Sequence, residues 1–131
     1  GKAQILQEGN DVTIIANGHL VWKALEAAKV LDERGVSVEV INMHTVKPLD
    51  EEAILASAQK TGRVVTAEEH QRFGGLGSAV AEVLAQKQPT AMEMVAVNDS
   101  FGESGTPEQL LEKYGLGRKD IVAAVDRVMS R

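Results

Sequence analysis

The chain has 131 residues and a mass of 14.0 kDa, the size of one domain, so residues 1–131 are predicted to form a single domain. Hydrophobic residues make up 44% and charged residues 25%, which excludes a disordered or fibrous chain. A net charge of −5 and only 3% aromatic residues argue against a nucleic-acid partner. No apolar run is long enough to cross a membrane, and cysteine is absent, so we expect no membrane partner and a cytoplasmic protein. Since Gly1 opens the chain without Met, we expect an excerpt of a longer protein.

The first half of the chain alternates between strand-like and helix-like segments. Strands are predicted at residues 3–7 and at residues 12–16, the second of which is apolar throughout. Because the four residues between them cannot hold the crossover that parallel neighbours need, we expect the first strand to be antiparallel, at an edge of the sheet. Apolar residues at helical spacing then predict a helix over residues 20–34, ended by Gly35. A third strand is expected at residues 36–43.

The second half continues the alternation. A short helix should begin at Asp50, whose side chain can cap it, and end at Gly62. The remaining segments are predicted in the order strand 63–67, helix 76–87, strand 92–97, helix 106–115 and helix 119–129. This alternation is typical of an α/β domain in which helices cover a sheet. We expect Leu25 and Ile41 to be buried against that sheet.

Polar residues and glycines follow the predicted strands, where open parallel sheets bind their ligands. The candidate rim consists of Glu68, Glu69, His70, Gly74, Gly75, Gly77 and His19. One interpretation is a proton-transfer or substrate-orienting site, with backbone N–H groups at a helix start that suit an anion. The alternative is structural, with the carboxylates paired to neighbours such as Arg72 and the glycines allowing close packing. We favour docking to a neighbouring domain over binding of a small molecule, because the acidic pair repels free anions.

The sequence contains no motif for a metal site or for a serine nucleophile. The three histidines are far apart and lack the spacing of metal ligands, and no serine lies in a Gly-x-Ser-x-Gly turn. We therefore predict no catalytic, cofactor-binding or metal-binding residue in this chain.

Several motifs together resemble the C-terminal domain of the transketolase family of thiamine-diphosphate enzymes. They are Asp11-Val-Thr-Ile-Ile-Ala-Asn-Gly18, Val46-Lys-Pro-Leu-Asp50, Thr61-Gly-Arg-Val-Val-Thr-Ala-Glu-Glu-His70 and Gly74-Gly-Leu-Gly-Ser78. The run Phe101-Gly-Glu-Ser-Gly-Thr-Pro-Glu-Gln-Leu-Leu-Glu-Lys-Tyr-Gly115 resembles the transketolase branch. Two other branches, deoxyxylulose-phosphate synthase and the β subunits of 2-oxoacid dehydrogenases, fit that run less well.

The resemblance implies a three-layer α/β/α sandwich around a mixed five-stranded sheet, mostly parallel with its first strand antiparallel. It implies a parent enzyme that moves two-carbon ketol units between sugar phosphates, as in the pentose phosphate pathway. Other domains of that parent would bind thiamine diphosphate and Mg²⁺, and this chain alone would bind no cofactor and be inactive. The expected partners are those remaining domains or an N-terminal subunit, within a homodimer. Since some transketolases are split into two chains, the resemblance also fits the C-terminal part of a split subunit. The alternatives are the two other branches or a free-standing regulatory or binding α/β module.

Overall fold

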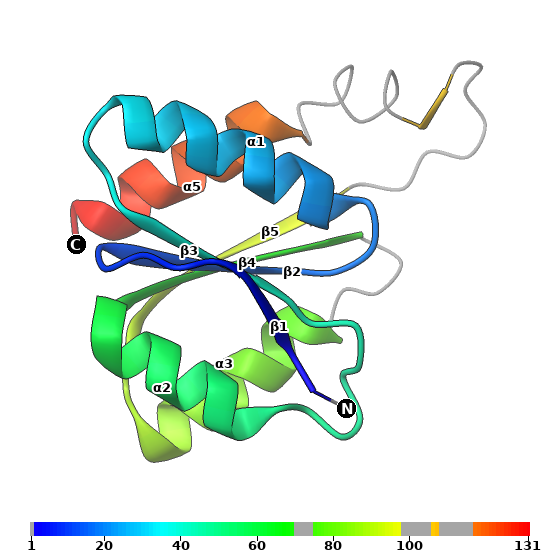
Figure 1. Ribbon diagram of the computed structural model, residues 1–131. Helices are drawn as coiled ribbons and strands as arrows, with labels where there is room; N and C mark the ends of the chain where they lie inside the picture. The colour runs from blue at the N-terminus through cyan, green and yellow to red at the C-terminus, as the bar shows by residue number, and fades with distance from the viewer. Residues whose placement is uncertain (1, 70–74, 98–105, 108–116) are drawn as a thin grey trace.

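A mixed five-stranded sheet with helices on both faces forms the core of the computed structural model (Figure 1). The structure describes residues 2–69, 75–97, 106–107 and 117–131. The elements, in chain order, are β1 (Gln4–Gln7), β2 (Val12–Ala16), α1 (Leu20–Glu33), β3 (Val38–Asn42), α2 (Glu51–Thr61), β4 (Arg63–Glu69), α3 (Leu76–Lys87), β5 (Ala91–Val97) and α5 (Arg118–Met129). The predicted α/β architecture is confirmed. Most of the helix predicted over 106–115 lies outside the described residues.

The sheet order is β1-β3-β2-β4-β5, and only β1 runs antiparallel to its neighbour. The expected antiparallel edge strand is therefore confirmed, although β1 pairs with β3 and not with β2, its neighbour in sequence. The link from β1 to β2 must consequently cross the amino end of β3. Gly9 makes that crossing, where an added Cβ would lie 2.2 Å from the carbonyl carbon of Val38. Only a residue without a side chain fits there.

Among the described residues, α1 and α5 cover one face of the sheet, and α2 and α3 cover the other (Figure 1). Every residue of β2 is buried, because its side chains alternate between the two layers. Ile14 belongs to the core beneath α1 and α5, and Ile15 to the core beneath α2 and α3. No helix in the described part of the chain is long and apolar enough to cross a membrane.

The predicted helix boundaries hold where local chemistry sets them. The Asp50 carboxylate accepts a hydrogen bond from the Ala53 N–H at 3.2 Å and one from the Ala3 N–H at 2.9 Å. These two donors hold the pKa of Asp50 below its usual value. At the other end of α2, Gly62 has φ +73°, the left-handed conformation in which glycine ends helices.

The buried face of α1 differs from the predicted one. Ile41 is fully buried as expected, but Leu25 is only partly buried and packs at the margin of the core. The buried stripe contains Leu20, Ala27 and Leu31, and it also contains Lys23. The reason is that α1 packs against α5 as well as the sheet, which turns the buried arc away from Leu25.

Candidate functional site

The polar segments that follow β2 and end β4 meet at the carboxyl edge of the parallel strands, as the topology requires. Ala16 at the end of β2 is level with Asn42 of β3 on one side and Ala67 of β4 on the other. The residues that follow these strands therefore lie at one edge, and the Met43 N–H donates to the Ala16 carbonyl at 2.9 Å. The structure thus brings together the Asn17-Gly18-His19 turn and the Glu68-Glu69 pair.

Glu68 is buried, with 2% of its surface exposed, and its carboxylate caps the N-terminus of α3. Its two oxygens accept the backbone N–H groups of Leu76 at 3.1 Å and Gly77 at 2.6 Å. A carboxylate at a helix N-terminus satisfies otherwise unpaired donors and suits the positive end of the helix dipole. These N–H groups are already bonded, contrary to the expectation of unpaired donors for an external anion.

The glycines at the start of α3 serve close packing. A Cβ on Gly77 would lie 2.8 Å from the Met94 sulfur on β5 and 2.9 Å from a Glu68 carboxylate oxygen. Gly75 is the N-cap residue of α3 and makes no side-chain cap, so the distant Glu68 side chain replaces a local cap. Gly74 and His70 lie outside the described residues, as does Arg72, the suggested ion-pair partner.

The turn after β2 approaches the end of β4. Gly18 has φ +57°, and a Cβ placed on it would lie 3.8 Å from a Glu69 carboxylate oxygen. His19, the N-cap residue of α1, is exposed and makes no side-chain cap. His44, beyond β3, is exposed as well. Around Glu69 the rim is therefore a partly exposed acidic surface, on which no base and nucleophile are brought into contact among the described residues.

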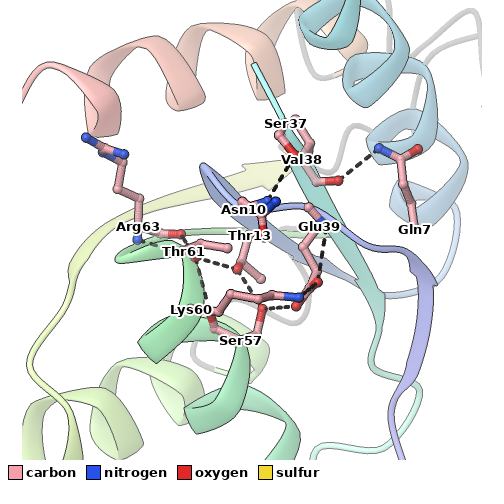
Figure 2. Close-up of polar contacts among 11 residues, drawn as sticks. Gln7, Asn10, Thr13, Ser37, Val38, Glu39, Ser57, Lys60, Thr61 and Arg63 are labelled. Carbon is pink, nitrogen blue, oxygen red and sulfur yellow. Dashed lines mark hydrogen bonds and ion pairs between the residues drawn. The ribbon is translucent and has the colours of Figure 1, made fainter. Parts of the chain in front are cut away.

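A buried polar cluster lies at the opposite, amino edge of the sheet (Figure 2). Glu39 of β3 is 1% exposed, and its carboxylate accepts hydrogen bonds from the Ser57 hydroxyl at 2.6 Å and from the Gly9 N–H at 3.2 Å. The Lys60 ammonium group pairs with the same carboxylate. Burial alone would raise the pKa of Glu39, but hydrogen bonds from Lys60, Ser57 and Gly9 outweigh it and hold that pKa below its usual value.

A chain of hydroxyl groups extends from this carboxylate. The Thr13 hydroxyl oxygen lies 2.6 Å from that of Ser57 and 2.7 Å from that of Thr61. Because Ser57 gives its one proton to ionised Glu39, Thr13 must donate to Ser57 and Thr61 must donate to Thr13. The cluster is satisfied internally and joins β2, β3, α2 and the Gly9 crossing, which indicates a structural role.

Sequence reasoning missed this cluster. Its signal was a single charged residue, Glu39, inside an otherwise apolar strand. Such a residue in a covered strand has to be paired, because a lone buried charge is costly. Nothing in the sequence pattern pointed to Ser57 and Lys60 as its partners, which lie on the next helix.

The described residues do not gather the usual ligands of a metal ion at one place. No group of three or more His, Asp or Glu side chains that could hold a metal is found within residues 2–69, 75–97, 106–107 and 117–131. The α3 start, which would otherwise suit a phosphate, is filled by Glu68. These residues do not fit a thiamine diphosphate–Mg²⁺ site.

Known proteins are similar to this chain over nearly its whole length. The family model described as "Transketolase, C-terminal domain" matches residues 1–121. A 6-deoxy-6-sulfo-D-fructose transketolase subunit from Clostridium sp. (strain MSTE9) is 53% identical over 131 residues, which are 100% of this chain and 41% of that protein. A 1-deoxy-D-xylulose-5-phosphate synthase from Desulforudis audaxviator is 44% identical, over 98% of this chain and 20% of that enzyme.

Among solved structures, a split gene transketolase described as an inactive β4 tetramer superimposes with a TM-score of 0.89 at 53% identity. The match covers 98% of this chain and 42% of that one. The chain thus spans about two fifths or less of the length of the proteins that it matches.

Proposed function

Because the chain belongs to the transketolase C-terminal domain family, we propose that it is the C-terminal domain of a split transketolase subunit. The observation that supports this assignment is the 53% identity, over essentially the whole chain, to a transketolase subunit and to a split gene transketolase, of which it spans 41% and 42%. The parent enzyme would transfer two-carbon ketol units between sugar phosphates, with thiamine diphosphate supplying the carbanion chemistry.

The proposed role of this domain is assembly and not chemistry. The Glu68 carboxylate already accepts hydrogen bonds from the α3 backbone, and the described residues do not fit the cofactor or its metal ion. The partly exposed edge around Gly18 and Glu69 is the surface we assign to docking against the remaining domains. The chain's partners would be those domains, a second subunit and further copies of its own subunit.

The sugar substrate of the parent depends on domains outside this chain. The pentose phosphate pathway was the expectation from family resemblance, whereas the Clostridium relative is named for 6-deoxy-6-sulfo-D-fructose. A second candidate function is 1-deoxy-D-xylulose-5-phosphate synthesis, because a synthase is 44% identical over 98% of the chain. The run at residues 101–115, used above to separate the branches, lies outside the described residues apart from 106 and 107.

The test is an activity assay on the complete subunit, with and without its partner subunit. We expect ketol transfer that depends on thiamine diphosphate and requires both subunits, and no activity or cofactor affinity from residues 1–131 alone. Formation of 1-deoxy-D-xylulose 5-phosphate in place of ketol transfer would favour the second candidate. Micromolar binding of thiamine diphosphate to residues 1–131, measured by calorimetry, would contradict the assembly role.

Docking and catalysis are separated by a variant at the carboxyl edge. If the edge docks, Glu69→Ala and His70→Ala in the assembled enzyme should weaken assembly while kcat per assembled enzyme changes only a few-fold. A loss of about 100-fold or more in kcat with assembly unchanged is the size expected for a general acid or base. That result would refute the docking role.

A further inference from the structure

Trp22, in the first turn of α1, is exposed over 68% of its surface. In the part of the chain that the structure describes, it is the most exposed large hydrophobic residue, ahead of Ile5, Met94 and Leu6. Single exposed aliphatic side chains are ordinary on protein surfaces. Tryptophan differs from them, because its ring system has a large area to bury and because the dominant residues of protein interfaces are enriched in it. Trp22 is therefore the first candidate for a contact with another surface.

Trp22 lies at the carboxyl edge of the sheet, beside the surface assigned above to docking. Residues 17–19 follow β2 and lead directly into α1, whose start lies on the same side of the molecule as the end of β4 (Figure 1). The Val21 N–H donates to the Gly18 carbonyl at 3.2 Å, which ties the first turn of the helix to this edge. Because side chains on a helix lean toward its N-terminus, the indole ring of Trp22 leans toward the exposed Gly18 and His19. Trp22 thus extends the docking surface.

The same edge carries a carboxylate that is not yet paired. A Cβ on Gly18 would lie 3.8 Å from a Glu69 carboxylate oxygen, so this carboxylate borders the turn before Trp22. Glu69 is partly exposed and forms no hydrogen bond or ion pair with the other described residues. A surface that covers Trp22 has to bring a cation to Glu69 as well, since burying an unpaired charge is costly. Arginine suits both groups, because its guanidinium stacks on aromatic rings and donates to carboxylates.

The surface that covers this edge follows from how much of a subunit the chain represents. The chain spans 41% of a transketolase subunit and 42% of a split gene transketolase, so most of a subunit of that kind lies outside these residues. Domains of one chain meet at a high effective concentration, which favours their contact over contacts between molecules. A second copy fits poorly, because a two-fold contact would place the Glu69 carboxylates of both copies in one interface.

We propose that Trp22 anchors this domain to the remainder of its own subunit, where an arginine of that remainder lies between the indole ring and the Glu69 carboxylate. The inference rests on the proposed function in one respect, because it requires that the chain is one domain of a longer subunit. It adds the residue that carries the docking contact and the chemistry of the surface that meets it.

Trp22 is the only tryptophan of the 131 residues, so its own signal can report its burial. The complete subunit and residues 1–131 are each labelled with 5-fluorotryptophan, and the fluorine signal of Trp22 is the one that Trp22→Phe lacks. A soluble paramagnetic agent broadens the signals of exposed groups. We expect this broadening to be roughly fivefold or more smaller in the complete subunit, because the side chain passes from 68% exposed to nearly buried. Equal broadening in the two proteins would overturn the proposal.

The same measurement identifies the surface that covers Trp22. Protection should be present in the complete subunit without its partner subunit, and it should not change with protein concentration. Protection that appears only after the partner subunit is added would assign the contact to that subunit. Protection that grows with concentration would assign it to a second copy. Either result would overturn the proposal.

Substitution tests whether Trp22 carries the docking contact. In the complete subunit, Trp22→Ala should speed hydrogen exchange of residues 17–22 by about tenfold or more, the loss expected at the dominant residue of an interface. In residues 1–131 alone it should change that rate by less than about twofold, because the ring is already exposed there. Leu6→Ala, which truncates another exposed apolar side chain on β1, is the matched control and should stay within about twofold in the complete subunit. Equal acceleration by the two substitutions would overturn the anchor role.

Glu69→Gln tests the arginine, and the activity assay separates this inference from the proposed function. Glu69→Gln should speed the same exchange severalfold in the complete subunit, and an unchanged rate would overturn the arginine contact. Ketol transfer by a complete subunit in which Trp22 stays as exposed as in residues 1–131 would refute the anchor alone. Absence of ketol transfer with Trp22 protected would refute the proposed function and support the anchor.

Discussion

Replacement of Glu39 tests how the amino edge of the sheet is held together. Glutamine at this position keeps the volume and one accepting oxygen, but its amide group donates where the carboxylate accepted. The Ser57 hydroxyl oxygen can then accept a hydrogen bond from the amide and donate its own proton to Thr13, and Thr13 can donate to Thr61. The Thr61 hydroxyl would donate to the Ser57 or Arg63 carbonyl, each 3.1 Å away. The hydroxyl chain thus reverses direction and remains satisfied.

The cost of Glu39→Gln should therefore come from weaker hydrogen bonds and from the second amide N–H, which finds no acceptor among the groups that contact this carboxylate. Lys60, with 40% of its side chain exposed, can return to water, so the ion pair itself contributes little. We expect a loss of about 1–2 kcal/mol, dominated by weaker hydrogen bonds to a neutral group. Glu39→Met is the matched control, which also leaves the buried Gly9 N–H unpaired, and it should cost about 2–4 kcal/mol.

The pH dependence provides a second, independent measurement. The folded-state pKa of Glu39 is lowered, so its ionisation stabilises the fold above the unfolded-state pKa of about 4.3. That stabilisation disappears as the pH falls through the lower, folded-state pKa. The difference in unfolding free energy between the natural chain and Glu39→Gln should be constant at neutral pH and should shrink below about pH 4. Urea denaturation at pH 7 and pH 3.5 measures both values. Equal stability of the two chains at pH 7, or a difference that does not change with pH, would refute the reasoning.

Five further substitutions probe the packing. Thr66 is fully buried and its hydroxyl has no partner among the described residues, so Thr66→Val should stabilise the fold by about 1 kcal/mol in the same denaturation assay. Thr13→Val is the contrasting variant: it breaks the hydroxyl chain and should cost about 1–3 kcal/mol. Gly9→Ala should cost about 3 kcal/mol, since its Cβ would overlap the β3 backbone, and a normal melting temperature would contradict this. Leu31→Ala should cost about 2–5 kcal/mol, and Leu25→Ala distinctly less, because Leu31 is fully buried and Leu25 is not; equal losses would show that the buried face of α1 is misassigned.

For the candidate site, the sequence indicated an edge of the sheet but not the contacts that its side chains make. The sequence indicated polar residues after the strands, and the parallel pairing of β2 with β3 and β4 brings the ends of these strands to one edge. The role of Glu68 could not be read in the same way. Its oxygens bind N–H groups eight and nine residues further along the chain, and that contact exists only once α3 packs against β4.

The order of strands and helices, the antiparallel first strand and the ends of α2 follow from the sequence by itself. Each depends on local properties: the period of the apolar residues, the four-residue link after β1, and the preferences of Asp50 and Gly62. The tertiary structure alone decided which side of α1 is buried and how Glu39 is paired. Both outcomes depend on surfaces that other elements supply, α5 for the helix and α2 with the Gly9 crossing for the carboxylate. The pattern of apolar and charged residues along one helix or strand indicates that a side chain must be buried or paired. Which residues bury or pair it depends on packing between segments distant in sequence.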